Sequence, residues 1–499
     1  MTPKNKLATD KEIIEAVKEH GSHALAAEAL GMGKSTVSNR LSLINKRGVH
    51  VEAEVTRPDA FKKTQTKKTK RYVVTCAVSN APVDKDFLAI LDLFCKEESA
   101  ELVVIPQDYQ WNDAVKGRQQ SDYDPLIADK LLSTDIELDK HVHIKGSYPL
   151  HCTLVNPLQG LGSASPGKSC IFGHPVRAMR AIATANDKFP LLNYTSGAIT
   201  KPRYTRSKSG HKAQGHHKIS AMFVESDGKG EAHFHELNYS EKYKNMQMID
   251  KVYTKDSISF DSVAGVVCGD EHVAICDKET IDAVFKGKNS LVGVLNPEIV
   301  CHNDLFDMHG TNHHIQNDLT TRFRRRIAGV NDVEKELKLT LKHLTDNKKG
   351  HRYKSLIVPS NHTEHLCSWL NNAQLAKEDP INYEIFHYLN YLKFKGIKEG
   401  DYKHAFQQYC SEHLENYDDV IWPSRNSEYK IKGYVVSNHL DKGPNGSRGS
   451  AAGIAALGQP TIGGHSHSPC IVGCVRQVGC QFKTAGYAIG LSSWLTTNA

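Results

Sequence analysis

Residues 463–468 read Gly-Gly-His-Ser-His-Ser and directly follow the apolar segment Pro-Thr-Ile. His465 and His467 stand one residue apart on a glycine-loosened turn, so both imidazoles can point at the same place. One such turn is weak support for a metal site. It gains weight only if further ligands arrive from other parts of the chain.

Four more polar clusters each follow a short apolar run. They lie at 269–272, 303–307, 360–362 and 437–439, after the runs 263–268, 298–301, 356–358 and 434–436. Short continuous apolar runs are typical of buried strands. Ligands of an open α/β sheet bind beyond the carboxyl ends of its strands. The pattern therefore predicts that the clusters meet at one sheet edge and build a single polar site.

The ligand types indicate which cofactor to expect. Mixed carboxylate and imidazole ligands suit Mn, Fe, Zn or Ni better than Ca or Mg. A carboxylate between two metals can bridge them at about 3.5–4 Å, the arrangement for in-line displacement at phosphorus. We expect two divalent metal ions, Mn²⁺ first, with Fe, Zn, Ni or Mg as the alternatives.

The order Asp-x-His, Asp-x-x-Asp, Asn-His, His and Gly-His-x-His resembles the calcineurin-like metallophosphoesterase superfamily, over roughly the C-terminal half of the chain. The resemblance implies an α/β fold with a β-sandwich flanked by helices. It implies that the first metal is held by Asp270, His272 and His467. It implies that the second is held by Asn361, His439 and His465, with Asp304 as the bridge. His362 would be the acid for the leaving oxygen.

The sequence departs from the family pattern beside these ligands. Asn303 stands where the family usually has glycine before the bridging aspartate, and Ser360 stands where it has glycine before Asn-His. Thr363 stands where an acid commonly follows, so the nearest substitute for orienting His362 is Glu364.

The totals indicate a soluble globular chain of more than one domain. It has 499 residues, 39% of them hydrophobic and 24% charged, with a net charge of +7. No apolar run approaches the roughly 18 residues of a membrane span, and the first residues lack the apolar core of a signal peptide. Twelve scattered cysteines favour a reducing cytoplasm, that of the host if the protein is phage-encoded. Cys470, Cys474 and Cys480 could be read as a zinc cluster but lack a correctly spaced fourth ligand.

Residues 1–50 predict a helix-turn-helix DNA-binding domain. Asp10 is expected to cap the first helix, Gly31 to take a positive φ, and Val37, Leu41 and Ile44 to face inward. The expected DNA contacts come from one helix and are Lys34, Ser35, Thr36, Ser38, Asn39 and Arg40. The alternative is a small helical module for packing or oligomerisation.

The rest of the chain divides by composition. Residues 51–70 form a basic linker able to contact phosphates non-specifically. Residues 71–260 begin with strand, helix and strand at 72–78, 86–95 and 101–105, and form either a separate α/β domain or the front of the catalytic sandwich. Residues 261–499 are the expected catalytic domain.

Several basic segments are candidates for substrate contact. Residues 195–217 are either a long surface loop or a loop over the metal edge. A helix that opens near residue 322 carries arginines that suit a polyanion, or form a solvated face. His309, His313 and His314 follow the bridging aspartate closely enough to touch a substrate phosphate.

The leading hypothesis is a metal-dependent DNase, because a metallophosphoesterase motif is joined to a DNA-binding module. The layout also resembles phage-encoded proteins of this superfamily, including early proteins tied to host-DNA degradation. The alternatives are a phosphatase or nucleotidase on small phosphoesters, and a DNA-binding regulator with a structural metal. The expected partner is DNA and not a membrane. The sequence leaves the oligomeric state open, and a homodimer is one possibility, since helix-turn-helix modules often act as dimers.

Overall fold

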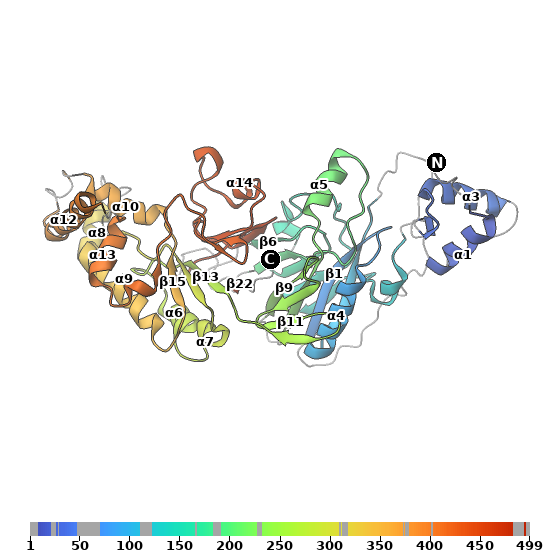
Figure 1. The fold of residues 1–499 in the computed structure, drawn as a ribbon, viewed down its shortest axis with the longest axis horizontal. Coiled ribbons are helices and arrows are strands. Elements are labelled where there is room, and N and C mark those ends of the chain that lie inside the picture. Colours follow the sequence, from blue (N-terminus) through green and yellow to red (C-terminus); the bar gives the residue numbers. More distant parts are fainter. Residues whose placement is uncertain are drawn as a thin grey trace. The chain divides into compact units, whose positions relative to one another are not determined.

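The structure is a computed structural model in which the chain falls into two compact units (Figure 1). The first comprises Met1–Ile182 and Leu191–Ser259, and the second Phe260–Thr497 with residues 183–190. The described residues are 8–20, 26–27, 29–46, 70–109, 122–164, 167–182, 191–226, 232–308, 311, 318–372, 374, 379–400, 403–482 and 494–495. The basic linker and His309, His313 and His314 therefore lie outside the described residues, apart from Lys70.

The N-terminal helices pack through one small apolar cluster. Helix α1 spans Asp10–His20 and α3 spans Lys34–Lys46. Val37, Leu41 and Ile44 are buried, which confirms their predicted inward orientation. Gly31 has φ +62°, which confirms the turn that the sequence predicts there.

The start of α1 differs from the prediction. Thr9, and not Asp10, caps the helix: its hydroxyl accepts from the Glu12 amide, and the Glu12 carboxylate accepts from the Thr9 amide and hydroxyl. This reciprocal pair is a capping box, which satisfies donors that the first helical turn leaves open. The predicted cap was one residue too late.

The expected DNA-reading face is partly used inside the domain. Thr36 and Asn39 are exposed, and the side chains of Lys34, Ser35 and Ser38 lie outside the description. The Arg40 guanidinium instead binds the Asp10 carboxylate and the Ala8 carbonyl, so it ties α3 to α1. DNA contact by this helix stays a prediction.

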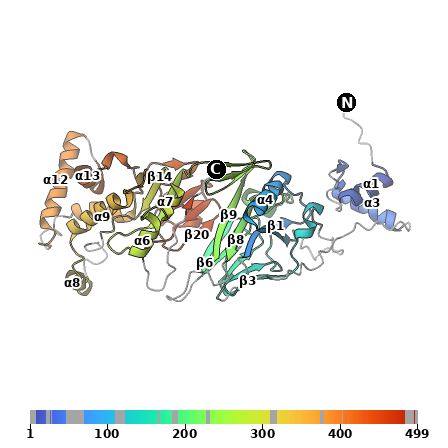
Figure 2. The same ribbon diagram turned by 90° about the horizontal axis from the view of Figure 1, so that it is seen from below.

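The remainder of the first unit is mixed α/β. Strand β1 (Lys70–Val78), helix α4 (Lys85–Glu98) and strand β2 (Glu101–Gln107) confirm the predicted strand-helix-strand, with the strands parallel. They belong to a seven-stranded sheet in the order β12-β11-β10-β9-β8-β1-β2. The added strands are β8 Ser220–Ser226, β9 Ala232–Ser240, β10 Asn245–Met248, β11 Lys251–Tyr253 and β12 Ile258–Phe260. Figure 2 shows α4 lying against this sheet, where Phe87 and Phe94 are fully buried.

A second group of strands lies in the same unit in the order β6-β7-β5-β4-β3. Their bounds are β3 Ile136–Asp139, β4 Val142–Lys145, β5 Ser169–Phe172, β6 Ala178–Ile182 and β7 Leu191–Thr195. Segment 195–217, predicted as a long loop, contains helix α5 (Lys208–His216), capped by the Ser207 hydroxyl. The loop prediction was wrong for Lys208–His216. The Ser207 side chain accepts a hydrogen bond from the Gly210 amide and so stabilises the first turn of a helix, although the segment is polar.

The second unit contains a parallel sheet in the order β16-β15-β14-β13-β22, whose last strand is antiparallel. Its strands are β13 Gly265–Asp270, β14 Ile299–Asn303, β15 Lys354–Ile357, β16 Val420–Ile421 and β22 Trp494–Leu495. Another set of strands runs β17-β18-β19-β21-β20. These are β17 Lys430–Ile431, β18 Tyr434–Val435, β19 Thr461–Gly463, β20 Cys470–Val472 and β21 Val475–Gln477.

One apolar cluster joins these two sets of strands. Val267, Cys301 and Leu356 of the first pack with Tyr434 and Ile462 of the second. One core of the second unit thus lies between two layers of strands, as in a β-sandwich, and a larger one lies among the helices of residues 333–413. The mixed α/β class is confirmed, and the metallophosphoesterase fold stays a prediction.

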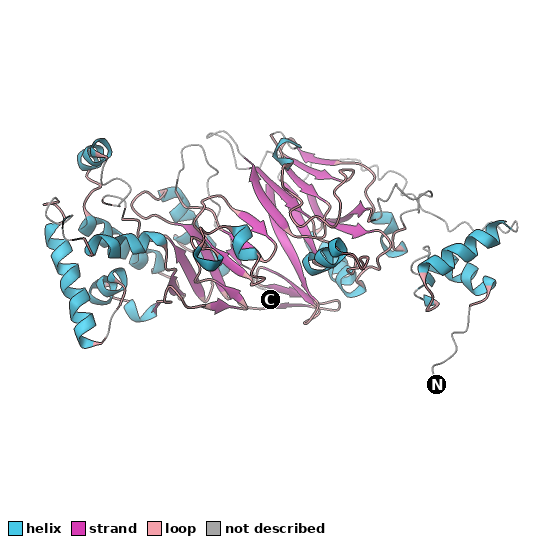
Figure 3. Ribbon diagram, turned by 90° about the horizontal axis from the view of Figure 1, so that it is seen from above, coloured by secondary structure: helices cyan, strands magenta, loops and turns pink. Residues whose placement is uncertain are grey.

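Helices cover the parallel sheet and extend beyond it (Figure 3). They are α6 Lys278–Phe285, α7 Leu291–Leu295, α8 Leu319–Ala328, α9 Val333–Lys348, α10 Asn361–Leu370, α12 Tyr383–Glu399 and α13 Ala405–His413. Helix α14 (Ala451–Ala455) packs instead on β20 and β21 of the other set of strands. Short 3₁₀ helices lie at Pro125–Lys130, Leu161–Ala164, Tyr417–Asp419 and Pro444–Gly446. Among the described residues, every helix is too short or too polar to span a bilayer.

The Thr9 cap gives a test of the N-terminal fold. We expect Thr9→Ala to cost about 1 kcal/mol, because the first turn loses its hydroxyl acceptor. Amide hydrogen exchange in α1 should then be faster by about fivefold. Lys11→Ala, which removes only an exposed pair with Glu15, is the matched control and should leave exchange within error. Equal exchange in both variants would contradict the cap.

Candidate metal centre

The first three ligand clusters lie at the carboxyl ends of neighbouring parallel strands. Asp270 is the last residue of β13, and Asp304 directly follows β14. Asn361 begins α10 shortly after β15. Since Asp270 pairs with Asn303 across the two strands, the register itself places the two aspartates side by side.

The remaining clusters come from the other layer of the sandwich. His439 follows β18, and His465 and His467 follow β19, which runs parallel to β18. The prediction that all five clusters share one sheet edge is therefore wrong. Instead, the strand ends of two layers meet at the site, because the apolar runs that precede the clusters pack against one another across the two layers.

Asp304 lies at the middle of the group. Its Oδ2 is 2.8 Å from His439 Nε2, 3.6 Å from His272 Nε2 and 3.8 Å from His362 Nε2. Asp304 and His439 are completely or almost completely buried. One carboxylate oxygen thus faces three imidazole nitrogens, which suits a bridging ligand.

The first predicted metal set is brought together. The ligand atoms of Asp270, His272 and His467 lie within 4.8 Å of one another. His467 Nε2 is 3.6 Å from Asp270 Oδ2. Asp270, Asp304 and His439 form a second group within the same limit, so the two groups share Asp270.

The second predicted set is gathered less tightly. The ring centroids of His439 and His465 are 5.5 Å apart. The His465 backbone amide donates to Asp270 Oδ2 at 2.8 Å, so the turn is fixed to the first set through its main chain. Asn361 Oδ1 is buried, and its place in this ligand set stays a prediction.

The unsatisfied polar atoms test whether a cation fits. Asp270 Oδ1, Asp304 Oδ1, His272 Nε2 and Asn361 Oδ1 are buried and make no hydrogen bond in the described part of the chain. Leaving such atoms unpaired costs about 1–3 kcal/mol each. Asp304 Oδ2 and His439 Nε2 are likewise buried without a hydrogen bond among the described residues, and all six atoms are acceptors or lone-pair nitrogens. Their chemistry fits a divalent cation.

The backbone is strained at the same residues. His272, Asp304, His465 and His467 have positive φ values of 42°, 41°, 85° and 56°. Each such conformation costs about 1–3 kcal/mol in a residue with a Cβ and tends to persist at functional sites. The strain turns the side chains back toward one point, which regular strand geometry would not do.

Asp307 fixes two of the histidines and is the main residue that the sequence analysis missed. Its Oδ1 is 3.0 Å from His272 Nδ1 and 2.5 Å from His362 Nδ1. A proton on each Nδ1 leaves both Nε2 atoms directed at Asp304. The signal was present, because Asp307 closes the Asp-x-x-Asp motif. The prediction that Glu364 orients His362 is not supported, since Asp307 makes this contact.

Asn303, in place of the family's glycine, fixes a third histidine. Its Nδ2 donates to the Cys268 carbonyl at 3.0 Å, and its Oδ1 is 3.2 Å from His439 Nδ1. His439 therefore presents a lone pair at Nε2 when it is neutral. That lone pair faces an Asp304 oxygen at 2.8 Å, so either a proton or a cation must lie between them.

The residues around Asn361 serve the helix. Ser360 caps α10 and forms a capping box with Thr363, which explains both departures from the family pattern. Glu364 instead groups with Cys367 and His404. His404 Nδ1 accepts from the Phe406 amide, so its Nε2 carries the proton that faces Cys367 Sγ at 3.1 Å. This cluster is thus satisfied without a metal.

The electrostatics separate the two central carboxyls. Burial raises the pKa of Asp270 to about 7. Burial alone would also raise the pKa of Asp304, but the imidazoles led by His439 outweigh it and lower that pKa. Burial would lower the pKa of His362, but Asp307 and Asp304 raise it to about 9. Protonated imidazoles thus supply positive charge where a metal would.

Position 464 must be glycine because the Asp270 carboxylate leaves no room for a side chain there. A Cβ at this position would lie 1.8 Å from Asp270 Oδ1. The glycine pair of the His-x-His turn therefore allows the close approach that lets the His465 amide reach Asp270. Gly464 thus serves this contact, in addition to any role in loosening the turn.

Comparisons with known proteins show a similarity to a phage protein. The chain is 26% identical over 451 residues to Protein A1 of Escherichia phage T5, a match that covers 87% of this chain and 80% of that protein. No family model matches the sequence, and no solved structure matches it. The similarity supports a phage-type protein and leaves the superfamily resemblance resting on the motifs.

Gly464 provides a test of the metal centre. We expect Gly464→Ala to weaken Mn²⁺ binding by at least about tenfold, because the added methyl displaces a ligand carboxylate. Titration calorimetry measures the affinity directly. Gly215→Ala, where a Cβ meets open space, is the control and should bind as the wild type does. Unchanged affinity in Gly464→Ala would refute the assigned role of Asp270.

The raised pKa of Asp270 predicts the pH dependence of metal binding. Below about pH 7 the metal-free carboxyl is protonated, so an incoming cation must displace that proton. Affinity for Mn²⁺ should fall as the pH is lowered from 8 to 6, and binding should release protons. The number released is measured by calorimetry in buffers of different ionisation enthalpy. Affinity that rises over this range would contradict the prediction.

Proposed function

We propose that this protein is a metal-dependent phosphodiesterase that hydrolyses DNA with two divalent ions. The observation that carries the proposal is the buried Asp304 carboxylate with three imidazole nitrogens within 3.8 Å of one oxygen. Asp270, His272 and His467 would hold one ion, and Asn361, His439 and His465 the other, with Asp304 between them. Mn²⁺ is the preferred ion for this mixed ligand set.

His362 is proposed as the general acid. Bound divalent ions supply charge for the phosphate oxygens and acidity for the attacking water. The His362 side chain is 22% exposed, so a leaving oxygen can reach it. Asp307 holds Nδ1 and keeps Nε2 facing the centre, and Asp307 and Asp304 raise the pKa of the metal-free ring to about 9. Nε2 then donates its proton to the departing oxygen.

Arg325 supports a phosphate substrate at this centre. It lies on α8, whose sequence contains four arginines and no acidic residue. Its Nη1 is buried and has no hydrogen-bond partner among the residues that the structure describes, and burial lowers the guanidinium pKa while Asp307 opposes that shift. A donor left open near the ligand cluster suits an anionic oxygen.

The choice of DNA rests on the N-terminal segment. Helices α1 and α3 share one apolar cluster, and Thr36 and Asn39 are exposed on α3, which is compatible with the predicted helix-turn-helix. The following linker is basic, and similarity to a phage protein agrees with the phage-type resemblance. These features favour a nucleic acid over a small phosphoester.

The proposal is tested by digesting DNA with a metal panel. Purified protein with Mn²⁺ should cut DNA, and Asp304→Ala and His439→Ala should abolish cutting, because the first removes the proposed bridge and the second removes a proposed ligand of one ion. His362→Ala should lower kcat by about 10²–10⁴-fold with Mn²⁺ binding retained. His387→Ala, an exposed histidine on α12, is the matched control and should remain fully active.

The same assay separates the competing functions. Turnover of a chromogenic phosphodiester without DNA cleavage would favour a phosphatase or nucleotidase. Specific DNA binding by the full chain without hydrolysis in Mn, Ni, Co or Mg would favour a regulator with a structural metal. Cleavage retained in both Asp304→Ala and His439→Ala would refute the site itself.

A further inference from the structure

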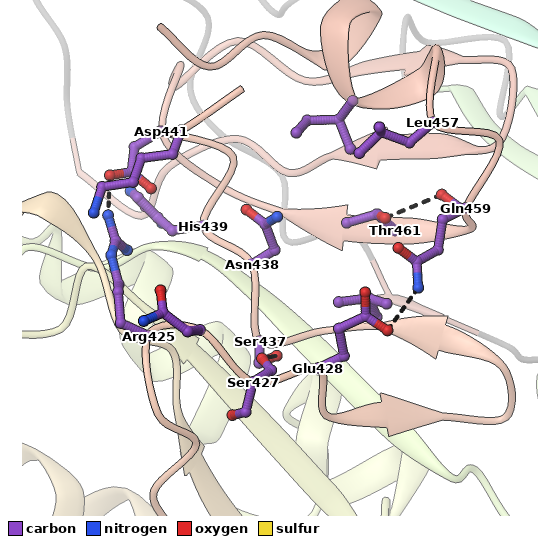
Figure 4. Close-up of a pocket in the computed structure, with 14 residues that line it drawn as sticks. Arg425, Ser427, Glu428, Ser437, Asn438, His439, Asp441, Leu457, Gln459 and Thr461 are labelled. Carbon is purple, nitrogen blue, oxygen red and sulfur yellow. Dashed lines mark hydrogen bonds and ion pairs between the residues drawn. The ribbon is translucent and has the colours of Figure 1, made fainter. Parts of the chain in front are cut away.

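We propose that the cavity beside His439 is a subsite for a single unpaired nucleobase, an inference that rests on the proposed function and names its substrate more closely. The cavity has a volume of about 210 Å³ and is formed entirely by the second unit. Figure 4 shows His439, Asp441 and Arg425 at one end, and Leu457 and Gln459 at the other.

The first step is position. His439 lines the cavity while its Nε2 lies 2.8 Å from Asp304 Oδ2. A group in the cavity is therefore next to the metal centre. In a nucleic acid, the group found one sugar away from a scissile phosphate is a base.

The second step is charge. Arg425 binds the Asp441 carboxylate and the Pro359 carbonyl, so its charge is neutralised inside the wall. The Glu428 carboxylate is 3.0 Å from Lys430 Nζ and accepts from Gln459 Nε2 at 2.8 Å. Three of the four Lys, Arg, Asp and Glu residues that line the cavity are thus paired, and the fourth, Lys442, is exposed to solvent. The paired groups disfavour a second phosphate inside the cavity and favour a neutral occupant.

The third step is the chemistry of the lining. Asn438 projects into the cavity between His439 and Thr461 (Figure 4). Its Oδ1 accepts from the Leu440 amide, which leaves the Nδ2 hydrogens as donors. Ile454 and Leu457 add an apolar surface. Amide donors and acceptors beside an aliphatic wall match a base, which has apolar faces and a polar edge.

The fourth step is size. A cavity of about 210 Å³ admits one base but is too small for a base pair. A nucleotide must then be single-stranded, or turned out of the duplex, before its base can enter. The site should accordingly prefer unpaired DNA over intact duplex.

A cavity-filling variant tests the subsite in the full-length protein. Leu457 is 57% exposed, so Leu457→Trp can fill the cavity without disturbing the core. We expect it to raise KM for a single-stranded oligonucleotide by about tenfold, the scale of one lost base contact. Turnover of bis(p-nitrophenyl) phosphate, which has no base, should not change. Leu339→Trp, at a residue 44% exposed on α9, is the control and should alter neither.

Binding of deoxynucleosides gives a readout that is independent of hydrolysis. Calorimetry should detect a deoxynucleoside in the wild type and in Leu339→Trp, and lose it in Leu457→Trp. If the wild type cleaves neither substrate, the proposed function fails while this binding still decides the subsite. The subsite is overturned if the wild type binds no deoxynucleoside, or if Leu457→Trp binds it as the wild type does. It is also overturned if Leu457→Trp lowers turnover of the oligonucleotide and of bis(p-nitrophenyl) phosphate equally.

Discussion

The arrangement of side chains in the candidate metal centre depends on one buried charge, the carboxylate of Asp304. A carboxylate with no access to water needs positive charge beside it, and the structure supplies three imidazole nitrogens within 3.8 Å of one oxygen. In the metal-free protein, protons on those rings provide the charge, which lowers the pKa of Asp304 while burial raises that of Asp270 to about 7. Divalent ions would replace the protons with the same sign of charge, so the pocket is arranged for cations whether or not they are bound.

A surrounding layer of hydrogen bonds makes this arrangement specific. Asp307 holds the Nδ1 atoms of His272 and His362, and Asn303 holds that of His439, so each ring presents Nε2 inward. Positive φ angles at His272 and Asp304 store strain that such contacts must offset. The departures from the family pattern thus fall into two groups. Asn303 orients a ligand, whereas Ser360 and Thr363 stabilise the helix that begins at Asn361.

The neighbouring cavity differs from the metal centre in its electrostatics. Around Asp304, buried acceptor atoms and lone pairs have no hydrogen-bond donor among the described residues, which favours a cation. Around Asn438, Arg425 is paired with Asp441 and Glu428 with Lys430, while Lys442 is exposed to solvent, so the cavity favours a neutral group. The two regions share only His439 among these residues, which lets a charged phosphate and an uncharged base lie side by side. The proposed nucleic acid substrate, in which charged and neutral groups alternate, would occupy both regions.

The sequence by itself determined the local features of this protein. It placed the strands before each ligand cluster, the helices of the N-terminal segment and the inward side chains Val37, Leu41 and Ile44, because apolar runs and helical periodicity act over a few residues. It could not assign the partners of polar groups, which are chosen across the fold. Asp307 and not Glu364 holds His362, Arg40 turns to Asp10, and two layers of strands meet at the site in place of one. Those outcomes depend on which surfaces pack together, and only the tertiary structure decides that.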